Sequence, residues 1–201
     1  MERRIYLASR SPRRRELLRQ VGISFEMLLL REKAPRGADI DETPMAGEAA
    51  DTYVARVCLA KAQAAWQRVE QRRLPRMPVL GADTTVCVGE EILGKPENAQ
   101  DAARMLALLS GKEHRVLSAV TIIFAAQVES VVSESFVRFC EISEAGIRSY
   151  VDSGEAYGKA GAYGIQGRAT AWISLLRGSY SGVMGLPLFE TTQLLERFPK
   201  P

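Results

Sequence analysis

The strongest constraint in the sequence is its opening, where a short apolar segment runs directly into a basic turn and then a helix. Residues 5–8 are typical of a buried strand, and residues 13–21 are typical of a short helix. Between them, Ser11 suits the N-cap and Pro12 suits the first helical position. Such a helix start binds anions through its free N–H groups and dipole, and the three arginines at 13–15 add paired donors. The opening therefore predicts a phosphate site, with a capped helix and a solvated basic face as the alternative.

Positive charge is concentrated at the same end of the chain. The 201 residues carry a formal net charge of +3, yet residues 1–36 hold ten Lys or Arg against four Asp or Glu. This head has a charge of +6, so the remaining residues sum to −3. A basic head on a slightly acidic protein predicts a local anion site. It does not predict a nucleic-acid surface, which would spread the charge and interleave aromatic residues.

Composition indicates an ordinary globular protein, with 46% hydrophobic and 25% charged residues. This length allows one large domain, or two lobes that share one core. No apolar run approaches a membrane span, and the chain opens without a secretion signal. Three widely spaced cysteines, Cys58, Cys87 and Cys140, argue against a disulfide framework and a zinc site. We therefore expect a single domain over residues 1–201, located in the cytoplasm, with no membrane partner.

Hydrophobic patterning predicts strands that alternate with helices. The expected strands are 5–8, 25–30, 79–88, 91–93, 116–125, 128–142 and 171–176, and the expected helices are 13–21, 48–73, 102–109, 143–151 and 185–198. A long loop is expected at 31–47. On the helix 48–73, an apolar stripe is expected along Tyr53, Val57, Ala60 and Ala64.

Asp83 is the first candidate for chemistry, because it lies in the middle of a predicted strand, where aspartate is disfavoured. An unpaired buried charge is costly, so such a carboxylate needs a partner or a role. Its chemistry suits a general base or a metal ligand, and the sequence leaves both open. Lys95 follows the predicted hairpin and is placed to reach the same cleft. The single histidine, His114, is expected to be structural.

Further candidates lie in loops and at a helix edge. The acidic cluster at 39–42, which includes Glu42, is consistent with solvated loop acids and equally with a Mg²⁺ site. Lys61 stands at the edge of the apolar stripe, where it either reaches water or projects into a cleft. Residues 154–167 include five glycines, which suit close approach to a ligand or a flexible linker. Gln166 carries a donor and an acceptor suited to reading a base edge.

Four of these segments, in this order, resemble motifs of the Maf family of nucleoside triphosphate pyrophosphatases. They are Leu-Ala-Ser-Arg-Ser-Pro-Arg-Arg-Arg-Glu-Leu-Leu (7–18), Gly-Ala-Asp-Thr (81–84) with Gly-Lys-Pro (94–96), the segment 159–167, and Gly-Ser-Tyr (178–180) with Gly-Leu-Pro (185–187). The third, Lys-Ala-Gly-Ala-Tyr-Gly-Ile-Gln-Gly, is similar to the branch described as dTTP/UTP pyrophosphatases. The resemblance covers nearly the whole chain.

The resemblance implies an α/β fold with a mixed, twisted sheet, flanking helices and two lobes around a central cleft, as in inosine triphosphatase-like proteins. It implies hydrolysis of dTTP and UTP at the α–β phosphoanhydride, giving the monophosphate and pyrophosphate. It also implies a divalent cation, Mg²⁺ or Mn²⁺, and a homodimer. Water would attack the α-phosphorus while a carboxylate takes its proton or holds a metal-bound water.

The resemblance also assigns roles to individual residues. Asp83 matches the catalytic base, and Glu42 and Asp83 match the metal ligands. The positions linked to substrate binding and selection are Ser9, Arg13, Lys61, Thr84, Lys95 and Gln166. Arg14 and Arg15 are left as structural or solvated residues.

Two positions depart from the family pattern. Gly158 stands where an Asp usually precedes Lys-Ala-Gly, and Ser118 with Ala119 replaces a more usual Thr-Gly. The first change removes a loop anchor or a polar contact, so reduced activity or broader specificity is expected. Hydrolysis of 7-methyl-GTP or other modified nucleotides is one alternative function. A nucleotide-binding regulator of septum formation without turnover is another.

Overall fold

The computed structural model describes residues 4–30 and 39–199, and these residues form one mixed sheet with helices on both faces. The sheet has the order β2-β1-β3-β5-β6-β7 within the described residues, and β4 pairs with β3 outside this path. β1 is parallel to β2 and β3, whereas the other pairs are antiparallel. The strands are β1 (Arg4–Leu7), β2 (Ser24–Met27), β3 (Val79–Val88), β4 (Glu91–Leu93), β5 (Glu113–Phe124), β6 (Gln127–Phe139) and β7 (Ile173–Arg177). The predicted mixed α/β class is confirmed.

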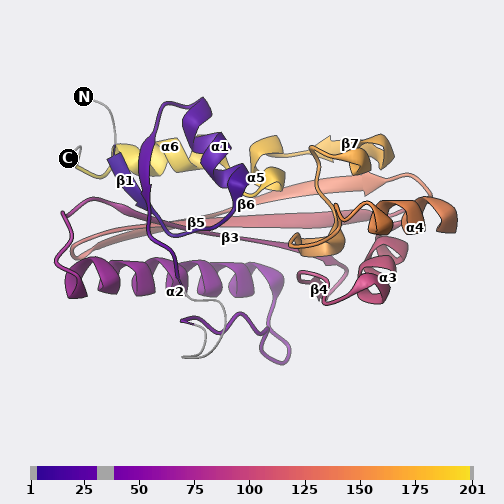
Figure 1. Ribbon diagram of the computed structural model, residues 1–201, viewed down its shortest axis with the longest axis horizontal. Helices are drawn as coiled ribbons and strands as arrows, with labels where there is room; N and C mark the ends of the chain where they lie inside the picture. The colour runs from indigo at the N-terminus through magenta and orange to yellow at the C-terminus, as the bar shows by residue number, and fades with distance from the viewer. Residues whose placement is uncertain (1–3, 31–38, 200–201) are drawn as a thin grey trace.

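Helices cover the two faces unequally (Figure 1). α2 lies along one face, and α1, α5 and α6 lie along the other, while α3 and α4 gather at the end of the molecule near β4. The helices are α1 (Pro12–Gln20), α2 (Ala50–Gln71), α3 (Ala99–Leu109), α4 (Glu144–Asp152), α5 (Tyr180–Met184) and α6 (Leu188–Glu196), with short 3₁₀ helices η1 (Ala160–Ala162) and η2 (Arg168–Trp172). None of the helices in the described part of the chain is long and apolar enough to cross a membrane.

The long strands β5 and β6 run through two lobes (Figure 1). In one lobe, α1 and α6 pack on the sheet through a core that includes Leu17, Leu18 and Leu195. In the other, α3 and α4 pack around Leu106 and Tyr150. The two lobes therefore share one sheet, and the central part of β3 lies where they meet.

Local signals account for several element boundaries. Ser11 caps α1 by accepting from the Arg14 N–H, and Pro12 is the first helical residue, as expected. Asn98 likewise caps α3 by accepting from the Asp101 N–H. The expected β2 is too long, because the strand ends at Met27. The helix α5 was not expected, and part of the predicted loop 31–47 lies outside the described residues.

The apolar stripe of α2 differs from the prediction. Tyr53 and Val57 are buried, but Ala60 and Ala64 are only partly buried. Ala62 and Ala65 are instead fully buried against the sheet. Both sets of positions follow the 3.6-residue helical period, so the period alone does not select the buried face. At 100° per residue, Ala62 and Ala65 lie about a third to a half of a turn around the helix from Tyr53, so the buried face moves around α2 along its length.

Gly81 sets the distance between α2 and β3. A Cβ atom added at Gly81 would lie 2.9 Å from both the Cβ and the backbone nitrogen of Ala62. The strand therefore approaches the helix so closely that no side chain fits between them. Lys61 is next to Ala62, and Asp83 is two residues beyond Gly81 on the same face of β3. The contact consequently fixes how far these two side chains stand apart.

We predict that Gly81→Ala lowers the free energy of unfolding by about 1–3 kcal/mol, because the methyl group overpacks the α2–β3 contact. Urea denaturation measures this change. Gly94→Ala is the matched control, because an added Cβ there has nothing within 4 Å. Equal stability of the two variants would contradict the prediction.

Candidate functional site

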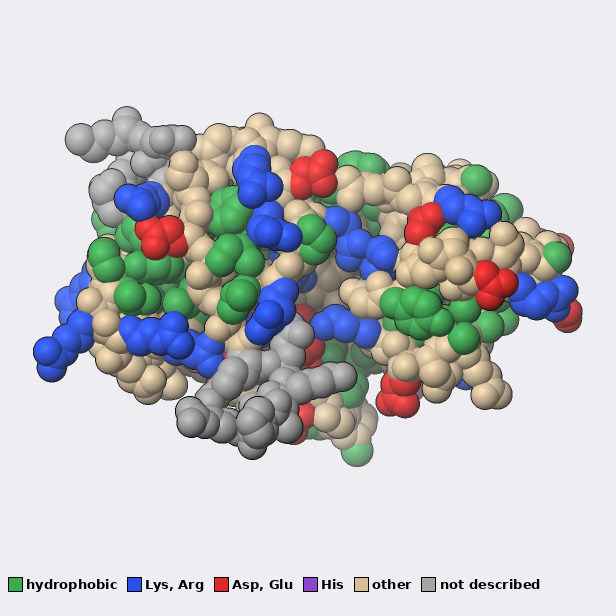
Figure 2. Space-filling view, viewed as in Figure 1, with side chains coloured by type: hydrophobic (Ala, Val, Ile, Leu, Met, Phe, Trp, Pro, Cys, Tyr) green, Lys and Arg blue, Asp and Glu red, His purple; other side chains and the backbone are tan. Residues whose placement is uncertain are grey.

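A cleft of about 1130 Å³ opens between the two lobes. Figure 2 shows Lys and Arg side chains gathered around this hollow. Its walls come from the turn before α1, the middle of β3, the segment before α2 and the Gly-rich loop before η2. The sequence-predicted residues in these walls are Ser9, Arg13, Glu42, Lys61, Asp83, Thr84 and Lys95. The fold thus brings seven of the eight predicted site residues to one cleft.

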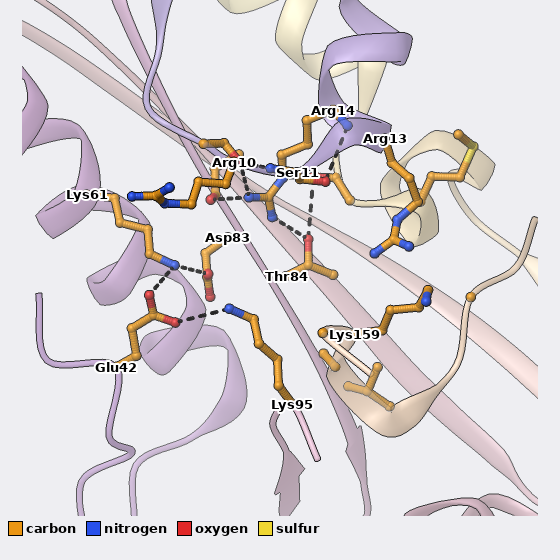
Figure 3. Close-up of a pocket in the computed structure, with 18 of the residues that line it drawn as sticks. Arg10, Ser11, Arg13, Arg14, Glu42, Lys61, Asp83, Thr84, Lys95 and Lys159 are labelled. Carbon is orange, nitrogen blue, oxygen red and sulfur yellow. Dashed lines mark hydrogen bonds and ion pairs between the residues drawn. The ribbon is translucent and has the colours of Figure 1, made fainter. Parts of the chain in front are cut away.

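Lys61 joins the two predicted carboxylates at one end of the cleft (Figure 3). Its Nζ lies 2.7 Å from Asp83 Oδ1 and 2.9 Å from Glu42 Oε1. The Lys61 and Asp83 side chains are only 13% and 11% exposed, so this pair is shielded from water. Lys61 therefore projects into the cleft, as one of the two sequence interpretations expected.

Lys61 and Glu42 stabilise each other's ionised forms. Burial lowers the pKa of Lys61, but Asp83 and Glu42 outweigh it and raise that pKa above its ordinary value. Burial raises the pKa of Glu42, and Lys61 outweighs it, so the pKa of Glu42 is lowered overall. These shifts favour the charged forms of the Lys61 ammonium and the Glu42 carboxylate at the end of the cleft.

The backbone of the acidic segment is tied to α2. Tyr53 OH donates to the Glu42 carbonyl at 2.9 Å, and Arg56 donates to the Thr43 carbonyl at 3.1 Å. Burial, followed by Asp83 and Glu42, raises the pKa of Tyr53 to about 12, so its hydroxyl remains a donor. These bonds place Glu42 beside Lys61.

Arg14 is the central polar contact of the opening turn. Its guanidinium donates to the Gly185 carbonyl at 2.6 Å, the Ala82 carbonyl at 2.8 Å, Ser9 Oγ at 3.1 Å and Thr84 Oγ1 at 3.2 Å. Only the planar fork of arginine reaches four acceptors in this way. Arg14 is therefore structural, as expected, and it positions Ser9 and Thr84 at the cleft.

The second departure from the family pattern retains a hydroxyl at the site. Ser118 Oγ donates to the Gly182 carbonyl at 2.7 Å and lies 2.8 Å from Thr84 Oγ1. Thr84 is thus held from two sides, by Arg14 and by Ser118. Serine at this position supplies the bond that fixes Thr84.

The Gly-rich loop is packed against the sheet. The Gly161 N–H donates to the Gly94 carbonyl at 3.1 Å, and a Cβ added at Gly161 would lie 2.9 Å from Val86 Cγ1. Gly161 has a φ of +67°, which favours glycine. The loop therefore folds onto β3 and delivers Lys159 and Gly164 to the cleft wall.

Gln166 is the predicted site residue that the structure does not place in the wall. Its side chain is exposed, although its neighbour Ile165 lines the cleft. Its role in base selection stays a prediction. His114 is structural, as expected: it is buried, its Nε2 lies 2.8 Å from Tyr163 OH, and burial lowers its pKa to about 4.

Glu42 and Asp83 fit a divalent cation. Both direct an oxygen toward the same Lys61 nitrogen, so they face one space. The described residues contain no group of three or more His, Cys, Asp or Glu side chains that could hold a metal. Mg²⁺ commonly takes one or two carboxylates and completes its shell with water and substrate phosphates. A divalent cation held by these two carboxylates stays a prediction.

Lys159, which lines the cleft, and Tyr53, which holds a segment of its wall, were not among the predicted site residues. Lys159 belongs to the third motif and is the one cation of the segment 159–167, but the motif does not assign it a role. Tyr53 was assigned only to the apolar stripe, yet its hydroxyl holds the Glu42 backbone. No local pattern distinguishes such a tyrosine from a core residue, because its acceptor belongs to another segment.

We predict that Arg14→Lys destabilises the protein by about 3 kcal/mol, because a lysine leaves several acceptors of the buried fork unsatisfied. Urea denaturation gives the magnitude. Arg19→Lys, on the exposed side of the same helix, is the control and should change stability by less than about 0.5 kcal/mol. A loss in Arg14→Lys no larger than in the control would show that the bonds of Arg14 are dispensable.

Comparison with known proteins gives full-length matches. The family model described as "Maf-like protein" matches residues 4–198. A protein of Aromatoleum aromaticum named dTTP/UTP pyrophosphatase is 54% identical, covering 100% of this chain and 98% of its own length. Proteins of the same name from Ralstonia nicotianae and Cupriavidus metallidurans are 55% and 56% identical, covering 95% of this chain and 92% and 94% of their own lengths.

Among solved structures, the Ham1 protein of Staphylococcus aureus has a TM-score of 0.42 at 15% identity, covering 70% of this chain and 72% of its own. The family match spans nearly all of the residues that form both lobes and the cleft. The chain belongs to the Maf-like protein family.

Proposed function

We propose that this protein is a nucleoside triphosphate pyrophosphatase that hydrolyses dTTP and UTP to the monophosphate and pyrophosphate. The observation that carries the proposal is the Lys61–Asp83–Glu42 cluster at the end of a cleft rich in cations. Relatives that are 54–56% identical over nearly the full chain bear the name of this activity.

The reaction needs a group that accepts a proton from the attacking water. The water oxygen bonds to the α-phosphorus, the α–β bridging oxygen leaves with pyrophosphate, and one water proton passes to a base. We assign that base to Asp83, whose carboxylate lines the cleft. Lys61 holds its Oδ1 at 2.7 Å and thereby orients the carboxylate.

The reaction also needs positive charge around the phosphates. Lys61, Lys95 and Arg13 line the cleft and offset charge on the phosphate oxygens and on the departing pyrophosphate. Lys95 Nζ lies 4.0 Å from Glu42 Oε2 and is 58% exposed, so it is free to turn toward a ligand.

A divalent cation, Mg²⁺ or Mn²⁺, belongs to the proposal, with Glu42 and Asp83 as its protein ligands. When bound, it would supply further charge to the phosphate oxygens. The base and ligand roles of Asp83 are compatible, because a carboxylate has two oxygens. A cytoplasmic location, supported by three free thiols, and a homodimer, supported by the family resemblance, complete the proposal.

The proposed function is tested with purified protein, Mg²⁺ or Mn²⁺ and a panel of nucleotides that includes dTTP, UTP and 7-methyl-GTP. Phosphorus NMR identifies the products. We expect pyrophosphate and monophosphate from dTTP and UTP. Release of orthophosphate would mean attack at another phosphorus. Tight nucleotide binding without turnover would instead favour a regulatory protein.

We predict that Asp83→Asn lowers kcat by about 10²- to 10⁴-fold, because the amide cannot accept the proton of water. Nucleotide binding persists, because the cations of the cleft are unchanged, and calorimetry checks this. Asp152→Asn, at the exposed end of α4, is the matched control. A wild-type rate in Asp83→Asn would remove this residue from the chemistry.

We predict that Gln166→Glu changes the ratio of kcat/KM values between pyrimidine and purine triphosphates, because the variant loses an amide donor. Stability changes by less than about 0.5 kcal/mol, since the side chain is exposed. Gln63→Glu, exposed on α2, is the control. Unchanged ratios across the nucleotide panel would count against a base-reading role.

A further inference from the structure

We propose that Lys159 and Arg13 together form a subsite for one phosphate group of the nucleotide. The inference rests on the proposed function, because it assumes a phosphate-bearing ligand in the cleft. In Figure 3 the two side chains lie on the side of Thr84 away from Lys61 and Glu42. The cleft thus has a mixed end, where carboxylates and cations alternate, and a cationic end.

The side chains of Lys159 and Arg13 both lie close to Gly164. A Cβ atom added at Gly164 would lie 3.1 Å from Cδ and Cε of Lys159 and 3.9 Å from Nη1 of Arg13. A larger residue at this position would therefore press on the Lys159 side chain. The absence of a side chain lets a cation from the Gly-rich loop and a cation from α1 share one part of the wall.

No carboxylate among the described residues forms an ion pair with either cation. Burial, and next the charge of Arg13, lower the pKa of Lys159, while Glu155 opposes them less strongly. The Glu155 carboxylate is itself engaged by the Arg168 N–H at 2.9 Å. Burial also lowers the pKa of Arg13, and the nearby Tyr150 opposes this shift less strongly. Two partly buried cations that repel each other provide a strong electrostatic site for an anion.

Both side chains have donors to offer. Lys159 Nζ donates to the carbonyls of Glu155 and Tyr157. These two bonds hold the ammonium in place and leave its third N–H for a ligand. Arg13 is the second residue of α1, so its side chain leaves the helix beside the positive end of the helix dipole. A phosphate oxygen would thus meet an anchored ammonium, a guanidinium fork and a helix start.

Gly158 leaves no side chain beside Lys159, at the position where the family pattern usually has an Asp. It lines the cleft next to Lys159, has a φ of +69°, and an added Cβ would have nothing within 4 Å. The space therefore admits an Asp or an Asn, and both carry the same backbone strain. Comparing these two variants isolates the effect of one negative charge beside Lys159.

The first test measures binding of pyrophosphate, and separately of dTMP and UMP, to the full-length protein by calorimetry. We expect Lys159→Gln to bind at least one of these ligands about tenfold more weakly, which is the loss of one charged contact. Lys112→Gln is the control, because it removes the same charge from an exposed site outside the cleft. Weakened pyrophosphate binding assigns the subsite to the leaving group, and weakened monophosphate binding assigns it to the α-phosphate.

The second test compares Gly158→Asp with Gly158→Asn. The Asp variant should bind the affected ligand several-fold more weakly than the Asn variant, and high salt should reduce the difference because salt screens the charge. Thermal unfolding of each variant confirms that the fold is intact, and Lys159→Arg should restore binding if the lost charge caused the defect.

Equal affinities of wild type and Lys159→Gln for both ligands would overturn the subsite. So would equal affinities of the two Gly158 variants. These outcomes differ from failure of the proposed function, which would appear as wild-type protein that releases no pyrophosphate from dTTP or UTP. The binding measurements need no turnover, so the two results are read independently.

Discussion

The approach of α2 to β3 at Ala62 and Gly81 is the constraint on which the site depends. At this point the helix and the strand are separated by no side chain, since a Cβ at Gly81 would meet the helix backbone at 2.9 Å. The residues that flank the contact, Lys61 and Asp83, are thereby brought to 2.7 Å. Protein interiors are packed too tightly to absorb an added methyl group here without a shift. A packing contact thus sets the geometry of an ion pair.

The cleft contains two kinds of positive charge with different tasks. Arg14 donates to two backbone carbonyls and two hydroxyls, so it holds the opening turn, β3 and the end of α5 together. Lys61 is matched by carboxylates, which keep it charged despite burial. Arg13 and Lys159 have no such matching carboxylate among the described residues. Their charge remains available for a ligand, and that availability distinguishes a binding cation from a structural one.

Local signals in the sequence predicted much of this arrangement, because they depend on a few neighbouring residues. Ser11 with Pro12 predicted the start of α1, and an aspartate inside a strand singled out Asp83. The predicted apolar stripe of α2 is wrong after Val57, because spacings of three and four residues occur on several faces of a long helix that is rich in alanine. The two backbone carbonyls that accept from Arg14 lie 68 and 171 residues away, so no local pattern shows which arginine of three turns inward. The family resemblance singled out Arg13 for the cleft and left Arg14 as a structural or solvated residue, and the structure shows that Arg14 turns inward.

The continuity of the central strands determines how this cleft can move. β5 and β6 pair in one register from Glu113 opposite Arg138 to Phe124 opposite Gln127, and β3 pairs with β5 along nearly its whole length. These ladders pass through both lobes, so a hinge between the lobes would have to break backbone hydrogen bonds. Enzymes that close by domain rotation place a few loop residues at the pivot. The continuous sheet therefore holds the two lobes in a fixed relation, and a change in the width of this cleft would have to come from the wall segments that lie outside the strands.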